Sequence, residues 1–122
     1  MSRSKFARLV VVSGGVFGAI GVMSAAGASH SGDARNLGAI ASICLAHGPA
    51  LLALGLHGVR GRLYAGAALL LGFGTLIFVG DLALRQWLGA SPLPVAAPVG
   101  GIGMIAGWLM VILGGITAQA TE

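Results

Sequence analysis

The sequence has very little charge for its length. Only 8% of its 122 residues are Asp, Glu, Lys or Arg, whereas 57% are hydrophobic. A soluble domain of this length carries about 25% charged residues to cover its surface. The scarcity of charge therefore argues against a soluble protein and predicts one membrane domain, residues 1–122.

Cysteine and acidic residues are also scarce. The single cysteine, Cys44, excludes an internal disulfide and leaves the redox compartment unreadable. Seven Lys and Arg residues against three acids give a net charge of +4, but they fall in small groups at the ends of apolar runs. Nucleic acid binding needs a clustered basic face, so we expect no nucleic acid partner. We expect anionic lipid headgroups at Arg8, Arg60 and Arg62 instead.

Long apolar runs are plentiful. Four of them have spanning length, at approximately 9–28, 37–56, 63–84 and 96–118. Twenty helical residues cover about 30 Å of hydrocarbon, and lipid offers the backbone no hydrogen-bonding partner, so each run is expected to be helical. The connections are short and contain helix breakers, which favours antiparallel neighbours. The sequence predicts an all-α integral membrane protein, a four-transmembrane-helix up-down bundle.

The N-terminal segment permits two interpretations. Basic residues before an apolar core, followed by the small residues "AGA" at 26–28, are typical of a cleaved signal peptide. We expect the segment to be retained as the first span, with cleavage as the alternative.

Lys and Arg residues near the span ends predict the orientation. Two of them, Arg35 and Arg85, fall on one side, and five fall on the other. The positive-inside rule then places both termini and the second connection in the cytoplasm, with Trp87 anchoring the opposite interface. Those five residues are Arg3, Lys5, Arg8, Arg60 and Arg62.

Glycine is abundant, with 22 residues, and many glycines recur on single helix faces. Such stripes let membrane helices approach closely and gain van der Waals contact. We expect them to pack the four helices against each other; the alternative is that one stripe faces outward to dimerise or to dock on another membrane protein. The helix-packing residues predicted are Gly14, Gly18, Gly21, Gly48, Gly55, Gly100, Gly103 and Gly107.

His47 lies near the middle of the second predicted span. Polar groups at this depth are expensive, and a neutral imidazole has one donor and one acceptor to satisfy. Pro49 removes a backbone donor, which leaves the Leu45 carbonyl as one possible partner. We expect a neutral histidine bonded to a neighbouring helix; a proton relay, a ligand contact or a cofactor ligand are the alternatives. Cys44 shares its face, but two ligands are too few for a metal site.

Asp81 is the one acid within a predicted span, close to its outer end. Arg85 follows one helical turn later, at the spacing of an ion pair, and His30 and Arg35 arrive at the same level from the first connection. These four residues form a predicted outer polar cluster. We expect it to clamp the helix ends, with a solute or ion entrance as the alternative.

Sequence motifs for catalysis are absent. There is no nucleophile elbow, phosphate loop or metal-ligand set, and the glycine-rich stretches at 14–18 and 100–107 lie inside spans. We expect no catalytic residue, no metal and no cofactor.

Three stretches resemble the small membrane-protein family called domain of unknown function 423. They are "APVGGIGMIAGWLM" at 97–110, "LIFVGDL" at 76–82 and "AHGPALLAL" at 46–54. The resemblance implies a four-span protein of the bacterial inner membrane and carries no established activity. The matching residues are Pro98, Gly100, Gly101, Gly107 and Trp108 in the first stretch, Phe78 and Gly80 in the second, and His47 in the third.

The chain also departs from that family's pattern. Ile43 and Cys44 stand where the family usually has a tyrosine-glutamine pair, and Ser29 precedes His30 where the family has alanine. Asp81 occupies a position that is usually small. A polar network built on those family residues is therefore not carried over to this chain.

Glycine stripes without a catalytic constellation favour a non-catalytic membrane protein. We expect it to act by tight helix packing, as a homo-oligomer or as an accessory subunit of a larger membrane assembly. The alternative function is a transporter or channel for a proton or small solute that uses His47 and Asp81. Independently of the function, Trp108 lies well inside the fourth span and is expected to be a packing or lipid-facing residue.

Overall fold

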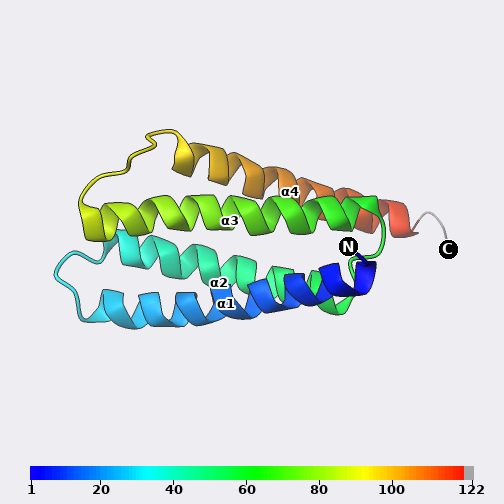
Figure 1. Ribbon diagram of the computed structural model, residues 1–122, viewed down its shortest axis with the longest axis horizontal. Coiled ribbons are helices and arrows are strands. Elements are labelled where there is room, and N and C mark those ends of the chain that lie inside the picture. Colours follow the sequence, from blue (N-terminus) through cyan, green and yellow to red (C-terminus); the bar gives the residue numbers. More distant parts are fainter. Residues whose placement is uncertain (120–122) are drawn as a thin grey trace.

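The computed structural model describes residues 1–119, all of whose regular structure is helical (Figure 1). The helices are α1 (Arg3–Ser29), α2 (Arg35–Leu56), α3 (Arg62–Leu88) and α4 (Ala96–Gln119). Each is long and apolar enough to cross a membrane, which confirms the predicted all-α fold with four transmembrane helices. The last three residues of the predicted domain lie outside the described part of the chain.

The helices are longer than the apolar runs that predicted them. Both α1 and α3 have 27 residues, which at 1.5 Å per residue is about 40 Å and exceeds the hydrocarbon thickness. The apolar runs mark only the lipid-embedded part. At one end, Ser2 Oγ accepts a hydrogen bond from the Lys5 backbone N–H, 3.4 Å away, and begins α1. At another, Gly89 ends α3 in the left-handed conformation, with φ of +76°.

The helices alternate in direction and form two hairpins. α1 packs closely along α2, and α3 along α4, while a smaller contact between α2 and α3 joins the hairpins. In Figure 1 the four helices lie in the order α1, α2, α3, α4, with both chain ends at the same end of the molecule. No Cα atoms of α1 and α4 approach within 8 Å among the described residues. The bundle is therefore flattened, with α2 and α3 at its centre.

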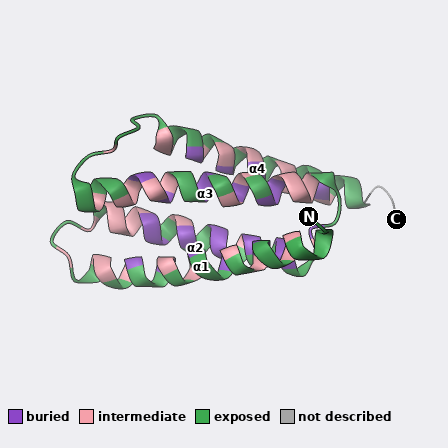
Figure 2. Cartoon of the chain, in the orientation of Figure 1, coloured by how far each residue is buried: buried purple, intermediate pink, exposed green. Residues whose placement is uncertain are grey.

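Burial follows this arrangement. Figure 2 shows the buried residues concentrated on the facing sides of the helices. Ile40 and Leu51 on α2 and Leu71 on α3 are at most 1% exposed. Since α1 and α4 lie on opposite sides of the bundle, this core is shared mainly between α2 and α3.

Backbone meets backbone inside the first hairpin. A Cβ atom at Gly14 would lie 2.7 Å from the carbonyl oxygen of Gly48, and one at Gly48 would lie 2.9 Å from the carbonyl oxygen of Gly14. Real Cβ atoms essentially never come closer than 3.0 Å. At Gly55 a Cβ atom would be 2.9 Å from the backbone nitrogen of Val11. The spacing between α1 and α2 therefore depends on the missing side chains.

The second hairpin repeats this contact with other residues. A Cβ atom at Gly100 would lie 2.7 Å from the carbonyl oxygen of Gly74. One at Gly107 would lie 2.8 Å from the side chain of Leu71. Gly103 is less tightly placed, because its Cβ position is 3.6 Å from the Cα atom of Gly74. The tight glycines thus face the partner helix of their own hairpin.

The remaining predicted packing glycines behave differently in the first hairpin. A Cβ atom at Gly21 would meet the Leu45 side chain at 2.8 Å, so a flexible group fills that space. At Gly18 nothing lies within 4 Å of the Cβ position, although its backbone approaches Gly48. Periodicity therefore groups these glycines on one face without separating the tight contacts from the open ones.

Candidate functional site

The imidazole of His47 is buried, with 6% of the residue exposed, and bonds within its own helix. Its Nδ1 lies 2.9 Å from the carbonyl oxygen of Ile43, four residues earlier. The local partner is thus the Ile43 carbonyl and not the Leu45 carbonyl, which the sequence offered as one possibility. A helical side chain lies over the turn that precedes its own Cα atom, which directs the ring to Ile43 instead.

The second ring nitrogen of His47 bonds to another helix. Trp108 on α4 donates its indole N–H to His47 Nε2 over 3.1 Å. The rings meet edge-on, with centroids 5.8 Å apart and an angle of 66°. Because an indole can only donate, Nε2 must accept and Nδ1 must carry the proton that goes to Ile43. Both imidazole nitrogens thus have protein partners.

This hydrogen bond links two helices whose backbones lie apart. No Cα atoms of α2 and α4 lie within 8 Å in the described part of the chain. The indole of Trp108 is long enough to cross the space between them and remains 39% exposed. Sequence reasoning treated Trp108 only as a packing or lipid-facing residue. The available signal was that His47 and Trp108 both belong to the stretches that carry the family resemblance.

Asp81 near the end of α3 is also fully engaged. One carboxylate oxygen, Oδ2, accepts from Arg85 Nε at 2.9 Å, and the other accepts from the hydroxyl of Ser91. The Ser91 hydroxyl oxygen in turn accepts from the Leu93 backbone N–H, 3.3 Å away. These bonds tie the connection between α3 and α4 to the end of α3. Sequence reasoning did not identify Ser91, because a loop serine has no periodicity to place it.

The other two members of the predicted outer polar cluster lie apart from Asp81. His30 is exposed and its backbone N–H caps the end of α1. Arg35 is the first residue of α2, and its backbone N–H donates to Asp33 Oδ1 at 3.4 Å. Among the described residues, the ion pair of Asp81 is made with Arg85. The predicted cluster is thus an Asp81–Arg85 pair, with His30 and Arg35 outside it.

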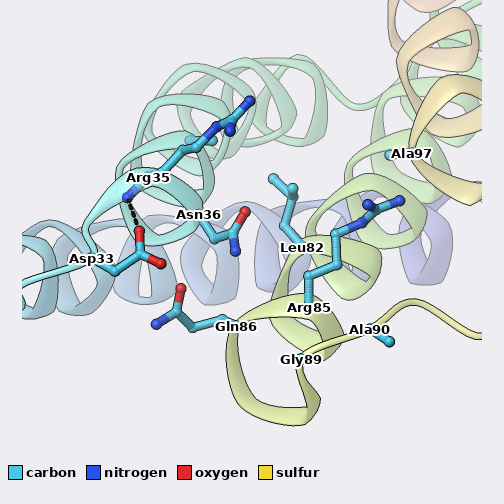
Figure 3. Close-up of a pocket in the computed structure, with 10 residues that line it drawn as sticks. Asp33, Arg35, Asn36, Leu82, Arg85, Gln86, Gly89, Ala90 and Ala97 are labelled. Carbon is cyan, nitrogen blue, oxygen red and sulfur yellow. Dashed lines mark hydrogen bonds between the residues drawn. The ribbon is translucent and has the colours of Figure 1, made fainter.

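A polar cavity of about 710 Å³ lies beside this pair (Figure 3). It brings together the start of α2, the end of α3 and the start of α4. Arg35 and Arg85 both line it, so the structure places these two predicted residues at one site without direct contact. The lining residues are Asp33, Arg35, Asn36, Ala39, Leu82, Arg85, Gln86, Gly89, Ala90 and Ala97.

The buried side chains of Cys44 and His47 both lie on α2. Within residues 1–119, the structure contains no group of three or more His, Cys, Asp or Glu side chains placed to hold one ion. Cys44 is a buried free thiol on α2.

The family of the chain follows from a comparison with family models. Residues 14–101, the larger part of the sequence, match the family described as protein of unknown function (DUF423). The chain belongs to this family. Searches of curated proteins and of solved structures found no match.

The DUF423 match covers only some of the polar residues described above. It contains His47 and Asp81, together with Gly48 and Gly100 at the helix contacts. It ends before Trp108, the partner of His47. In this DUF423 protein the buried hydrogen bond therefore joins a residue inside the matched segment to one beyond it.

Proposed function

We propose that the protein is a non-catalytic membrane protein that acts by packing, as a homo-oligomer or as an accessory subunit of a larger membrane assembly. The observation that carries this proposal is the apolar surface on the central helix α3. Leu69, Phe73 and Leu76 on α3 are 47%, 60% and 56% exposed. Because α3 lies at the centre of a flattened bundle, these side chains form an apolar surface that a further helix can cover.

The flattened bundle supports the same proposal. The tight glycine contacts are made within each hairpin, between α1 and α2 and between α3 and α4. The glycines are therefore already packed inside the protomer, and a partner would contact its outer apolar side chains. Beside the exposed side of α3, an apolar groove of about 650 Å³ lies between α1 and α3, with Phe17, Met23 and Leu76 among its lining residues. A helix of a second copy or of a partner protein fits this apolar groove, because membrane helices associate through the van der Waals contact that such packing provides.

We further propose that the protein lies in a bacterial inner membrane with both termini in the cytoplasm. Both chain ends and the α2–α3 connection lie at one end of the molecule (Figure 1). Arg8, Arg60 and Arg62 belong to that end, where anionic headgroups would neutralise them. Alkaline phosphatase and fluorescent protein fusions at the C-terminus test this orientation: a periplasmic C-terminus contradicts it.

Cross-linking tests the packing proposal. The wild-type chain is the background, because its one cysteine, Cys44, is fully buried. A Phe73→Cys variant places a thiol on the exposed side of α3, and an Ile112→Cys variant places one on the outer face of α4 as a matched control. With a membrane-permeant oxidant, we expect Phe73→Cys to form a covalent complex and Ile112→Cys to stay monomeric.

The mass of the extracted protein provides a second readout. After gentle detergent extraction we expect a protein mass above the 12.0 kDa of one chain, determined by light scattering with the detergent subtracted. Mass spectrometry then separates a homo-oligomer from a complex with another protein. A 12.0 kDa species together with no cross-linking at Phe73 rejects the proposal.

The alternative, transport of a proton or small solute, stays a prediction. It requires His47 and Asp81 to be available to a passing ligand. His47 instead uses both nitrogens, and Asp81 both oxygens, in bonds to protein groups. These bonds favour structural roles for the two residues. Proton flux into vesicles that contain the purified protein, compared for wild type and His47→Phe, tests the alternative directly.

A further inference from the structure

The polar cavity at the start of α2 and the end of α3 is lined by two arginines whose donors the protein leaves available. The Arg35 guanidinium makes no hydrogen bond or ion pair among the described residues. In Figure 3 it points away from Asp33, whose carboxylate instead accepts from the Arg35 backbone N–H. Arg85 uses Nε for Asp81, so its terminal nitrogens remain free to donate. Two guanidinium groups therefore line one cavity with their donors unused.

Two carboxylates near the cavity balance the formal charge of the two arginines, but they leave most of the guanidinium N–H donors unused. Asp33 is engaged with a backbone N–H at the start of α2. Asp81 is 3% exposed and bonds to both Arg85 and Ser91. The cavity is therefore suited to an anionic group that binds two arginines, and phosphate oxygens are such acceptors.

Gln86 supplies a hydrogen-bond acceptor to the same site, whereas the two arginines supply donors. It lines the same cavity, and its side-chain oxygen Oε1 is buried with no hydrogen-bond partner among the described residues. Figure 3 shows the Gln86 side chain extending from α3 toward the start of α2. A buried acceptor without a donor costs free energy, so a ligand that brings a hydroxyl or amine would relieve it. The cavity is therefore suited to an anionic ligand that also carries a hydrogen-bond donor.

The position of the cavity indicates where such a ligand comes from. Its lining residues lie within about 9 Å of the ends of α2 and α3. Trp87, 70% exposed on the same turn of α3, is placed as an interfacial anchor. A volume of about 710 Å³ exceeds the size of a bare phosphate and lies within the range of small-molecule sites. A cavity at the ends of the spanning helices, beside an interfacial tryptophan, lies at the depth of lipid headgroups.

We propose that this cavity binds the phosphate-bearing headgroup of a membrane phospholipid. The phosphate contacts Arg35 and Arg85, and a headgroup hydroxyl or amine donates to Gln86. The acyl chains extend from this end of the molecule along the exposed apolar side chains of the helices. This site is independent of whether the chain associates with a partner.

Native mass spectrometry with defined lipids tests the proposal. Delipidated protein in detergent is titrated with phosphatidylglycerol, or with diacylglycerol of the same acyl chains. We expect one phosphatidylglycerol to bind per chain and diacylglycerol to bind at least about tenfold more weakly, since one charge-assisted contact is worth about that factor. The Arg35→Gln variant should weaken phosphatidylglycerol binding by about tenfold for the same reason.

Arg3→Gln is the matched control, because it removes the same charge from an exposed residue at the start of α1, at the other end of the molecule. We expect it to leave the single bound phosphatidylglycerol unchanged, and Arg35→Lys to retain part of the affinity. Arg35 begins α2 and has no side-chain partner, so circular dichroism should show an intact fold in its variants.

Three results would overturn the proposal. Equal binding of diacylglycerol would remove the role of the phosphate. An equal loss in Arg35→Gln and Arg3→Gln would indicate general attraction to charged lipid. Displacement of phosphatidylglycerol by millimolar glycerol phosphate would identify a soluble phosphate ester as the ligand. The diacylglycerol comparison uses wild-type protein, so it decides the matter even if a variant fails to fold.

Discussion

Replacing Trp108 by phenylalanine removes one hydrogen bond and leaves one buried acceptor unpaired. The indole N–H donates to His47 Nε2 over 3.1 Å, and His47 is 6% exposed, so water cannot easily replace the donor. An orphaned buried acceptor costs about 1–3 kcal/mol, whereas hydrogen bonds between membrane helices average about 0.6 and reach about 1.7 kcal/mol. Since Trp108 is itself 39% exposed, we expect Trp108→Phe to lower the free energy of unfolding by about 1–1.5 kcal/mol.

The second tryptophan supplies the control. Trp87 is 70% exposed and makes no side-chain hydrogen bond among the described residues, so Trp87→Phe should change stability by less than about 0.5 kcal/mol. Unfolding is followed by circular dichroism in mixed micelles of increasing denaturing detergent. This readout does not depend on the tryptophans that are replaced.

A double-mutant cycle isolates the bond itself. His47→Phe and the double variant with Trp108→Phe should give a coupling energy of about 0.5–1.5 kcal/mol, because each single change already removes the same hydrogen bond. Nitrogen NMR of the imidazole should show the proton on Nδ1, as the indole donor requires. A coupling energy near zero, or a proton on Nε2, would refute the reasoning.

Two further predictions concern the helix contacts and the connection between α3 and α4. Gly14→Ala should destabilise the protein by about 1–3 kcal/mol, because its Cβ atom would lie 2.7 Å from a backbone oxygen of α2, whereas Gly15→Ala, with nothing within 4 Å, should be neutral or stabilising in the same unfolding assay. Ser91→Ala removes the hydroxyl that bonds to Asp81, so amide hydrogen exchange should accelerate in residues 89–95. In Ser29→Ala, a control whose hydroxyl bonds only within α1, exchange in that segment should be unchanged; equal acceleration in both variants would contradict the assignment.

The polar site could be predicted only in part, for a geometric reason. Arg85 was identified with Asp81 because one helical turn fixes their spacing before any tertiary contact forms. Ser91 and Trp108 were not identified as partners, because the chain turns between each of them and the residue it contacts. His30 and Arg35 reach the same end of the molecule as Asp81, yet a shared depth does not specify which side of the bundle a residue occupies.

The sequence by itself determined the number of helices, their alternating direction and the family of the chain. Apolar runs of spanning length must be helical in lipid, and short connections force neighbouring helices to be antiparallel. Only the tertiary structure decided which faces meet. Gly14 and Gly15 are adjacent in the sequence, but one is pressed against α2 and the other is open, because rotation of α1 about its axis is set by packing. The same packing brings Trp108 to His47 across 61 residues and places Arg35 beside Arg85 in one cavity.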